Sequence, residues 1–173
     1  MNLLITPDKM LHVDGKVYKV QIGASGFING DLKREGDLAT PCGVYPIREI
    51  YYRSDKIQLP PVKIPSHQIN KNDGWCDDPK DSAYNQFVKL PYPASCENLW
   101  REDRIYDIIV IIGYNDSPPI TGRGSAIFIH IARDDFRPTA GCVALDKDDL
   151  LEVLEYIDIS SYIEIMGDMA ELG

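Results

Sequence analysis

One histidine and one cysteine lie close enough along the chain to act together. His130 ends the apolar run Ala126–Ile129, and Cys142 follows twelve positions later, within the small-residue segment 139–145. An imidazole beside a thiol can accept its proton and later protonate a leaving group. We therefore predict that His130 activates Cys142 as a nucleophile and lowers its pKa below the ~8.5 of a free cysteine. A buried structural thiol beside a core histidine is the alternative interpretation.

Two apolar runs must position this pair. Residues 106–114 and 126–131 are short, rich in β-branched or aromatic residues and bounded by Gly or Pro. This pattern is typical of buried strands, and we expect the two runs to be neighbours that place His130 at a cleft. A helix is predicted after Asp146, which can cap it, with Leu150 on its buried face.

The rest of the chain also favours strands. The pattern predicts a hairpin over 10–23 around Asp14-Gly15, a loop over 23–37, a turn at 40–43, strand pieces at 44–47 and 50–52, a last strand at 162–166 and a second helix around 96–104. Residues 59–96 contain six prolines, which predicts a loop-rich excursion that is either an active-site cover or an irregular insertion. We expect one mostly β domain over 1–173.

Charge and hydropathy exclude several classes of protein. The net charge is −9, and nine carboxylates lie in the segment 146–173, which argues against nucleic acid as a partner. No apolar stretch approaches the ~20 residues of a membrane helix, and the first residues lack the pattern of a signal peptide. A soluble globular protein is expected, with no oligomeric state indicated.

The cysteines show no metal-binding spacing. Cys42, Cys76, Cys96 and Cys142 include no Cys-x-x-Cys pair, so a zinc ribbon is poorly supported and no metal or cofactor is expected. Four cysteines could form two disulfides, and the sequence leaves their pairing open.

The sequence around the pair resembles the L,D-transpeptidase catalytic domain, also called YkuD-like. That family carries a His followed by Ser/Thr-x-Gly-Cys and a hydrophobic residue, which is similar to His130 with segment 139–143. Further blocks of the family are resembled by residues 34–37, 40–45, 84–85, 113–115 and 122–128. The chain departs from the family pattern at Ala140 and Ala144, where many members carry His and Asn or Arg.

The resemblance implies a β-sandwich domain that acts on peptidoglycan stem peptides in the bacterial cell envelope, the periplasm. Cys142 would attack an L,D peptide bond, release D-Ala and form a thioester, with His130 as base and acid. The resemblance also implies that Gly141 orients the imidazole and lines the oxyanion site. An amine of a neighbouring stem would then resolve the thioester.

Substrate contacts are expected from residues near the motif. Arg123, Arg133 and Arg137 flank it and could bind the carboxylates of a stem peptide. Thr139, Tyr84 and Asn85 belong to the blocks that resemble the family.

Two other functions use the same residues. With water as acceptor, the protein would be an L,D-carboxypeptidase or another cysteine peptide hydrolase. A non-catalytic peptidoglycan-binding domain is the third reading.

Overall fold

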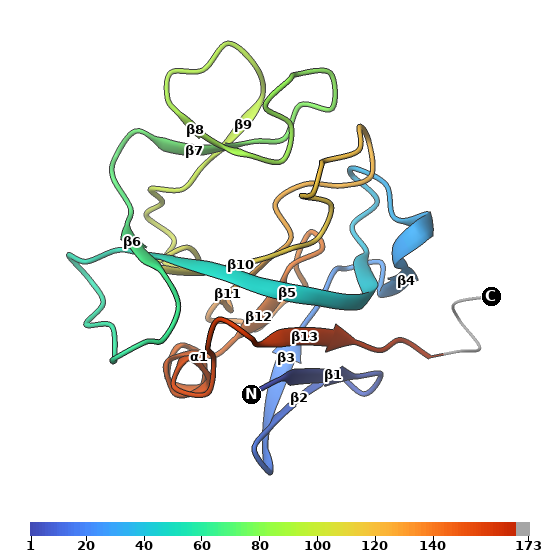
Figure 1. Cartoon of the computed structure of the whole chain (residues 1–173), viewed down its shortest axis with the longest axis vertical. Helices are drawn as coiled ribbons and strands as arrows, with labels where there is room; N and C mark the ends of the chain where they lie inside the picture. The colour runs from blue at the N-terminus through green and yellow to red at the C-terminus, as the bar shows by residue number, and fades with distance from the viewer. Residues whose placement is uncertain (169–173) are drawn as a thin grey trace.

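A computed structural model of the chain describes residues 1–168 (Figure 1). The last residues of the acidic segment 146–173, and of the domain expected over 1–173, lie outside this range. The elements in chain order are β1 (Leu3–Thr6), β2 (Met10–Val13), β3 (Lys16–Gln21), β4 (Phe27–Asn29), a 3₁₀ turn (Gly30–Leu32), β5 (Thr40–Tyr52), β6 (Ser66–Gln68), β7 (Asp73–Cys76), β8 (Phe87–Lys89), β9 (Cys96–Asn98), β10 (Ile108–Ile112), β11 (Phe128–Ile131), β12 (Val143–Leu145), α1 (Lys147–Leu154) and β13 (Tyr162–Ile165).

Two sheets share strands at both of their edges. The first sheet contains β1, β2 and β13, and the second contains β10, β11 and β12. The shared strands β3 and β5 join them into one continuous ladder. β5 pairs with β13 through residues 43–46 and with β10 through residues 47–52. β3 likewise pairs with β2 and, at its end, with β12. The mostly β sandwich predicted from the sequence is confirmed.

The second sheet is buried on both faces. Every residue of β10 is buried, because alternate side chains face two different hydrophobic cores. Ile108 and Val110 join the core between the two sheets, which α1 also closes. Ile109 and Ile111 join a second core on the opposite face. The expected pairing of the runs 106–114 and 126–131 is confirmed, since Ile109 lies opposite His130 in an antiparallel register.

A small sheet of β7, β8 and β9 covers the second core. It lies above β5 and β10 in the orientation of Figure 1, and its Trp75 packs edge-on against Phe128 of β11, with ring centroids 5.1 Å apart. The loop-rich excursion over 59–96 therefore contains short strands. The helix expected around 96–104 is wrong, because residues 96–98 pair with β7.

Local turn and cap patterns were predicted more accurately. Asp14 and Gly15 both have positive φ, of 49° and 75°, as the tight hairpin requires. The Asp146 side chain accepts from the backbone N–H of Asp148 at 2.9 Å and caps α1.

The turn expected at 40–43 is wrong, because these residues begin the long strand β5 and are held extended by pairing with β4 and β13. The loop expected over 23–37 contains the short strand β4.

Candidate active site

His130 and Cys142 face the same side of the second sheet. β11 and β12 are parallel, and their register pairs Ile129 with Val143 and His130 with Ala144. Ile129 and Val143 point into the core between the two sheets. Because successive side chains on a strand alternate, His130 and Cys142 both point to the opposite face, under the small sheet.

Backbone groups hold both reactive side chains. The Cys142 thiol donates to the carbonyl of Ala126 at 3.1 Å, and its Sγ accepts from the N–H of Phe128 at 3.3 Å. Nδ1 of His130 lies 2.8 Å from the carbonyl of Ile131. A carbonyl can only accept, so Nδ1 carries the proton and Nε2 is the basic nitrogen.

Burial keeps both groups neutral. It raises the pKa of the Cys142 thiol to about 12, with the Glu97 carboxylate adding to the rise. It lowers the pKa of His130 to about 4. The expectation that the thiol ionises more easily than a free cysteine is therefore wrong for the resting protein, because desolvation outweighs the stabilisation that a neutral imidazole provides.

Gly141 shapes the turn before the cysteine. Its φ is +138°, and a Cβ there would lie 2.9 Å from the carbonyl oxygen of Ala39. Its carbonyl accepts from Thr40 Oγ1 at 2.7 Å, and its N–H donates to Thr139 Oγ1 at 3.1 Å. The implied role of Gly141 in orienting the imidazole is wrong, because the ring bonds to Ile131 instead. Its N–H, expected to line the oxyanion site, is engaged by Thr139.

A cavity of about 260 Å³ opens over the pair. Ala140 and Ala144, with their single-methyl side chains, line this cavity together with Cys142 and His130. The cavity is also lined by charged side chains of both signs. The acidic ones are Glu35, Asp77 and Glu97, and the basic ones are Lys33, Arg101, Arg133 and Arg137. The cavity can therefore accept a ligand that carries both positive and negative groups.

A carboxylate and a phenol near the pair were missed by the sequence reasoning. Tyr106 donates to Glu97 Oε2 at 2.8 Å, and its ring meets the ring of His130 edge-on, with centroids 5.4 Å apart. Removal from water raises the pKa of Glu97 and that of Tyr106. Nothing in the local sequence indicated this, because Glu97 reaches the cavity through the pairing of β9 with β7.

The predicted substrate-binding residues divide into two groups. Arg133, Arg137 and Thr139 line the cavity with the pair. Arg137 is paired with Asp135 at 3.0 Å, and Arg133 lies 3.4 Å from Asp103.

The other three residues lie outside the cavity lining. Arg123 lines a separate pocket beside Tyr114. Tyr84 and Asn85 are buried, so their expected contact with substrate is not supported. They hold the loop that precedes β11: Asn85 Oδ1 accepts from the N–H of Ala126 at 3.0 Å, and the Tyr84 hydroxyl accepts from the N–H of Gly124 at 2.9 Å.

The Asn85 contact is important because Ala126 carries the carbonyl that holds the thiol. Ala126 has a φ of +54°, an uncommon conformation for a residue with a side chain. Asn85 Nδ2 also donates to the carbonyls of Tyr114 and Asn115, at 3.1 and 2.8 Å. Asn85 therefore positions the backbone beside Cys142.

Residues 1–168 contain neither an evident metal site nor a membrane-spanning helix. In that range no cluster of three or more His, Cys, Asp or Glu side chains is arranged to hold a metal ion. The one α-helix of that range, α1, is too short and too polar to cross a membrane.

The structure is a β sandwich whose parallel strands β11 and β12 bring a histidine and a cysteine to one cavity. The family comparison is more specific: residues 5–165 match the model of the L,D-transpeptidase catalytic domain, YkuD. The chain belongs to this family. No significant match to a curated protein was found.

Solved structures give a more distant likeness. An L,D-transpeptidase from Mycobacterium smegmatis is 14% identical, with a TM-score of 0.41 over 95% of this chain and 58% of that one. The helical cell shape determining protein Pgp2 from Campylobacter jejuni, in a mutant form, is 19% identical, with a TM-score of 0.40 over 96% of this chain and 46% of that one. The chain spans about half the length of these structures.

Proposed function

We propose that the protein is a cysteine-dependent L,D-transpeptidase that acts on peptidoglycan stem peptides. One observation carries the proposal: Cys142 and His130 face one cavity from adjacent strands, within a chain that belongs to the L,D-transpeptidase family. We also propose that the chain functions as one catalytic domain in the bacterial cell envelope, where its substrate is found.

The first half-reaction begins with the neutral thiol. Its proton points to the Ala126 carbonyl at rest, so the side chain must rotate before the proton can pass to Nε2 of His130. The sulfur then bonds to the substrate carbonyl carbon, the C–N bond to D-Ala breaks, and the imidazolium returns the proton to the leaving nitrogen.

The second half-reaction resolves the thioester. An acceptor amine gives a proton to His130 as it bonds to the acyl carbon, and that proton passes to the departing Cys142 sulfur. Arg133 and Arg137 line the cavity and would bind carboxylates of a stem peptide, and Glu35 and Glu97 would pair with an amine.

The test is release of D-Ala from a tetrapeptide stem by single cysteine variants. Cys142→Ser should abolish it, while Cys42→Ser, whose thiol lies outside the cavity lining, should retain it. Full activity of Cys142→Ser would overturn the proposal. Product analysis with and without an acceptor stem separates a transpeptidase from an L,D-carboxypeptidase.

The non-catalytic reading is favoured by one observation, the raised pKa of the Cys142 thiol. A binding domain would keep this thiol inert towards an electrophile, whereas an enzyme would be acylated at Cys142. Intact mass after incubation with a carbapenem distinguishes the two.

A further inference from the structure

Two cysteines outside the cavity lie directly opposite one another in the small sheet. Cys76 ends β7, Cys96 begins β9, and the antiparallel register pairs them. Directly opposed residues point to the same face of a sheet. The two thiols are close enough for each to shift the pKa of the other. Cys42 lies on β5 and Cys142 directly precedes β12, so neither belongs to the small sheet.

The hydrogen-bond pattern places this pair at a close position in the ladder. The backbone N–H of Cys76 donates to Gln86, and its carbonyl accepts from Asn85, so both groups face β8. Towards β9 the pair is therefore a non-hydrogen-bonded one, in which Cα atoms are ~4.5 Å apart and side chains approach most closely. Disulfides span Cα separations of ~4.4–6.8 Å, so the backbone needs little movement.

We propose that Cys76 and Cys96 form a disulfide that braces the wall of the active-site cavity. The residues that follow the cysteines, Asp77 and Glu97, both line the cavity. They point to the opposite face of the small sheet from the two sulfurs, because side chains alternate. A cross-link on the outer face would thus fix the spacing of two carboxylates on the inner face.

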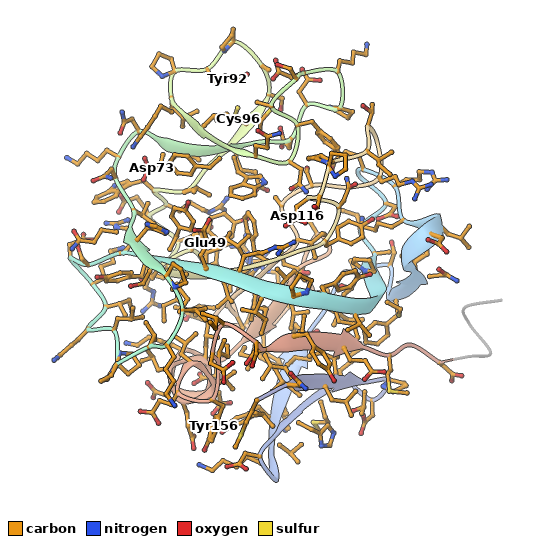
Figure 2. The ribbon with its side chains drawn as sticks, in the orientation of Figure 1. Glu49, Asp73, Tyr92, Cys96, Asp116 and Tyr156 are labelled. Carbon is orange, nitrogen blue, oxygen red and sulfur yellow. The ribbon has the colours of Figure 1, made fainter. Side chains whose placement is uncertain are left out.

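The oxidant is a disulfide compound, and Cys96 is the thiol it reaches. Cys76 is fully buried, whereas Cys96 is partly exposed near Tyr92 in the upper part of the molecule (Figure 2). The Cys96 thiolate attacks the oxidant R–S–S–R, and one R–S⁻ leaves and takes up a proton. The Cys76 thiolate then attacks the Cys96 sulfur and expels the second R–S⁻. Two protein thiols lose two electrons and two protons, and two R–SH molecules form.

The local charges set the conditions for this exchange. The Cys76 thiol lies 3.9 Å from Asp81 Oδ1, which also accepts from Tyr92 at 2.8 Å. Burial raises the pKa of Cys76 and raises that of Cys96 to about 11, with nearby carboxylates adding to both. Exchange should therefore be slow at neutral pH and faster in mildly alkaline buffer.

The experiment uses the full chain, reduced and then exposed to oxidised glutathione at mildly alkaline pH. Remaining thiols are alkylated and the protein is digested with trypsin. Lys71, Lys80, Lys89 and Arg101 place Cys76 and Cys96 on separate peptides, 72–80 and 90–101. We expect one species that joins these peptides and is lighter by two hydrogen atoms, with Cys42 and Cys142 alkylated.

Matched variants and a second measurement complete the test. Cys96→Ser should lose the linked species, and Cys42→Ser should keep it. Oxidation should slow hydrogen exchange several-fold at Asp77 and Leu99, whose amides bond across β7 and β9. Four alkylated cysteines, a stable glutathione adduct on Cys96, or a link to another cysteine would overturn the proposal. Unchanged amide hydrogen exchange after oxidation would show that the disulfide does not stabilise the cavity wall. None of these outcomes depends on transpeptidase activity.

Discussion

The two walls of the cavity are built in different ways. β11 and β12 carry His130 and Cys142 on strands that are buried on both faces. The opposite wall, made by the small sheet and residues 99–106, carries Glu97, Arg101 and Tyr106, which are held by polar side-chain contacts: Tyr106 donates to Glu97, and Arg101 donates to Asp103. The difference shows that buried strands and their backbone groups fix the reactive pair, while polar side-chain contacts shape its surroundings.

Removing the imidazole should have the largest effect on activity. We expect His130→Gln to slow acylation of Cys142 by ~10²–10⁴-fold, because a positioned acid and base is lost from both proton transfers. Intact mass against time with a carbapenem measures the rate. His67→Gln is the matched control, since His67 is exposed and pairs with Glu49, and it should react like the wild type. Equal rates in both variants would contradict the role of His130.

Removing the Asn85 side chain, which bonds to both walls of the cavity, should lower the free energy of unfolding. Asn85→Ala removes four hydrogen bonds, including those to Trp75 of the small sheet and to Ala126 beside the thiol. We expect the free energy of unfolding in urea to fall by about 2–4 kcal/mol, because buried partners are left unsatisfied. The exposed neighbour provides the control: Gln86→Ala should change it by less than about 0.5 kcal/mol. A similar small change in Asn85→Ala would show that this link is not needed.

The buried imidazole should make stability fall at acid pH. The pKa of His130 is lowered to about 4 in the folded chain, against ~6.5 when unfolded, so between these values the unfolded state binds the extra proton. Neutral His130 therefore contributes up to about 3 kcal/mol to the free energy of unfolding. This contribution is present in full above pH ~6.5 and is lost as pH falls towards 4. Urea unfolding at several pH values should show this slope in the wild type, and His130→Gln should reduce it. If the free energy of unfolding changed with pH in the same way in both proteins, His130 would have an ordinary pKa in the folded chain.

The arginines should show the smallest effect. Arg137 lines the cavity but is exposed and paired with Asp135, so its loss should raise KM for a stem peptide only about two- to fivefold. Arg123 lines a different pocket, and Arg123→Ala should leave KM unchanged. Steady-state kinetics of both variants measures the two KM values. A larger rise of KM in Arg123→Ala than in the Arg137 variant would contradict the assignment of Arg137, and not Arg123, to the substrate cavity.

The sequence predicted the parts of the molecule that depend on local patterns. Continuous apolar runs identified β10 and β11, and Asp14-Gly15 and Asp146 identified the hairpin and the start of α1. The His130 and Cys142 pair was found because its motif is local. The turn expected at 40–43 failed because pairing with distant strands holds those residues extended.

The cavity surroundings could not be read in the same way. Glu97 was assigned to a helix, although pairing with Trp75 places it in β9. Tyr84 and Asn85 belong to a segment that resembles a family block. The same sequence pattern is expected whether these residues contact the substrate or support the loop before β11. The thiol pKa depends on how completely the small sheet covers Cys142, which is a property of tertiary packing.

The central claim is that His130 takes the proton from a neutral Cys142 thiol during attack. The pH dependence of Cys142 acylation by a carbapenem, followed by intact mass in the wild type and His130→Gln, tests it most directly. The wild-type rate should be level from about pH 5 to 9 and fall towards pH 4, where His130 becomes protonated. The variant should react only through free thiolate, so its rate should rise about tenfold per pH unit below the thiol pKa of about 12. The same profile in both proteins, or no adduct on Cys142, would contradict the claim.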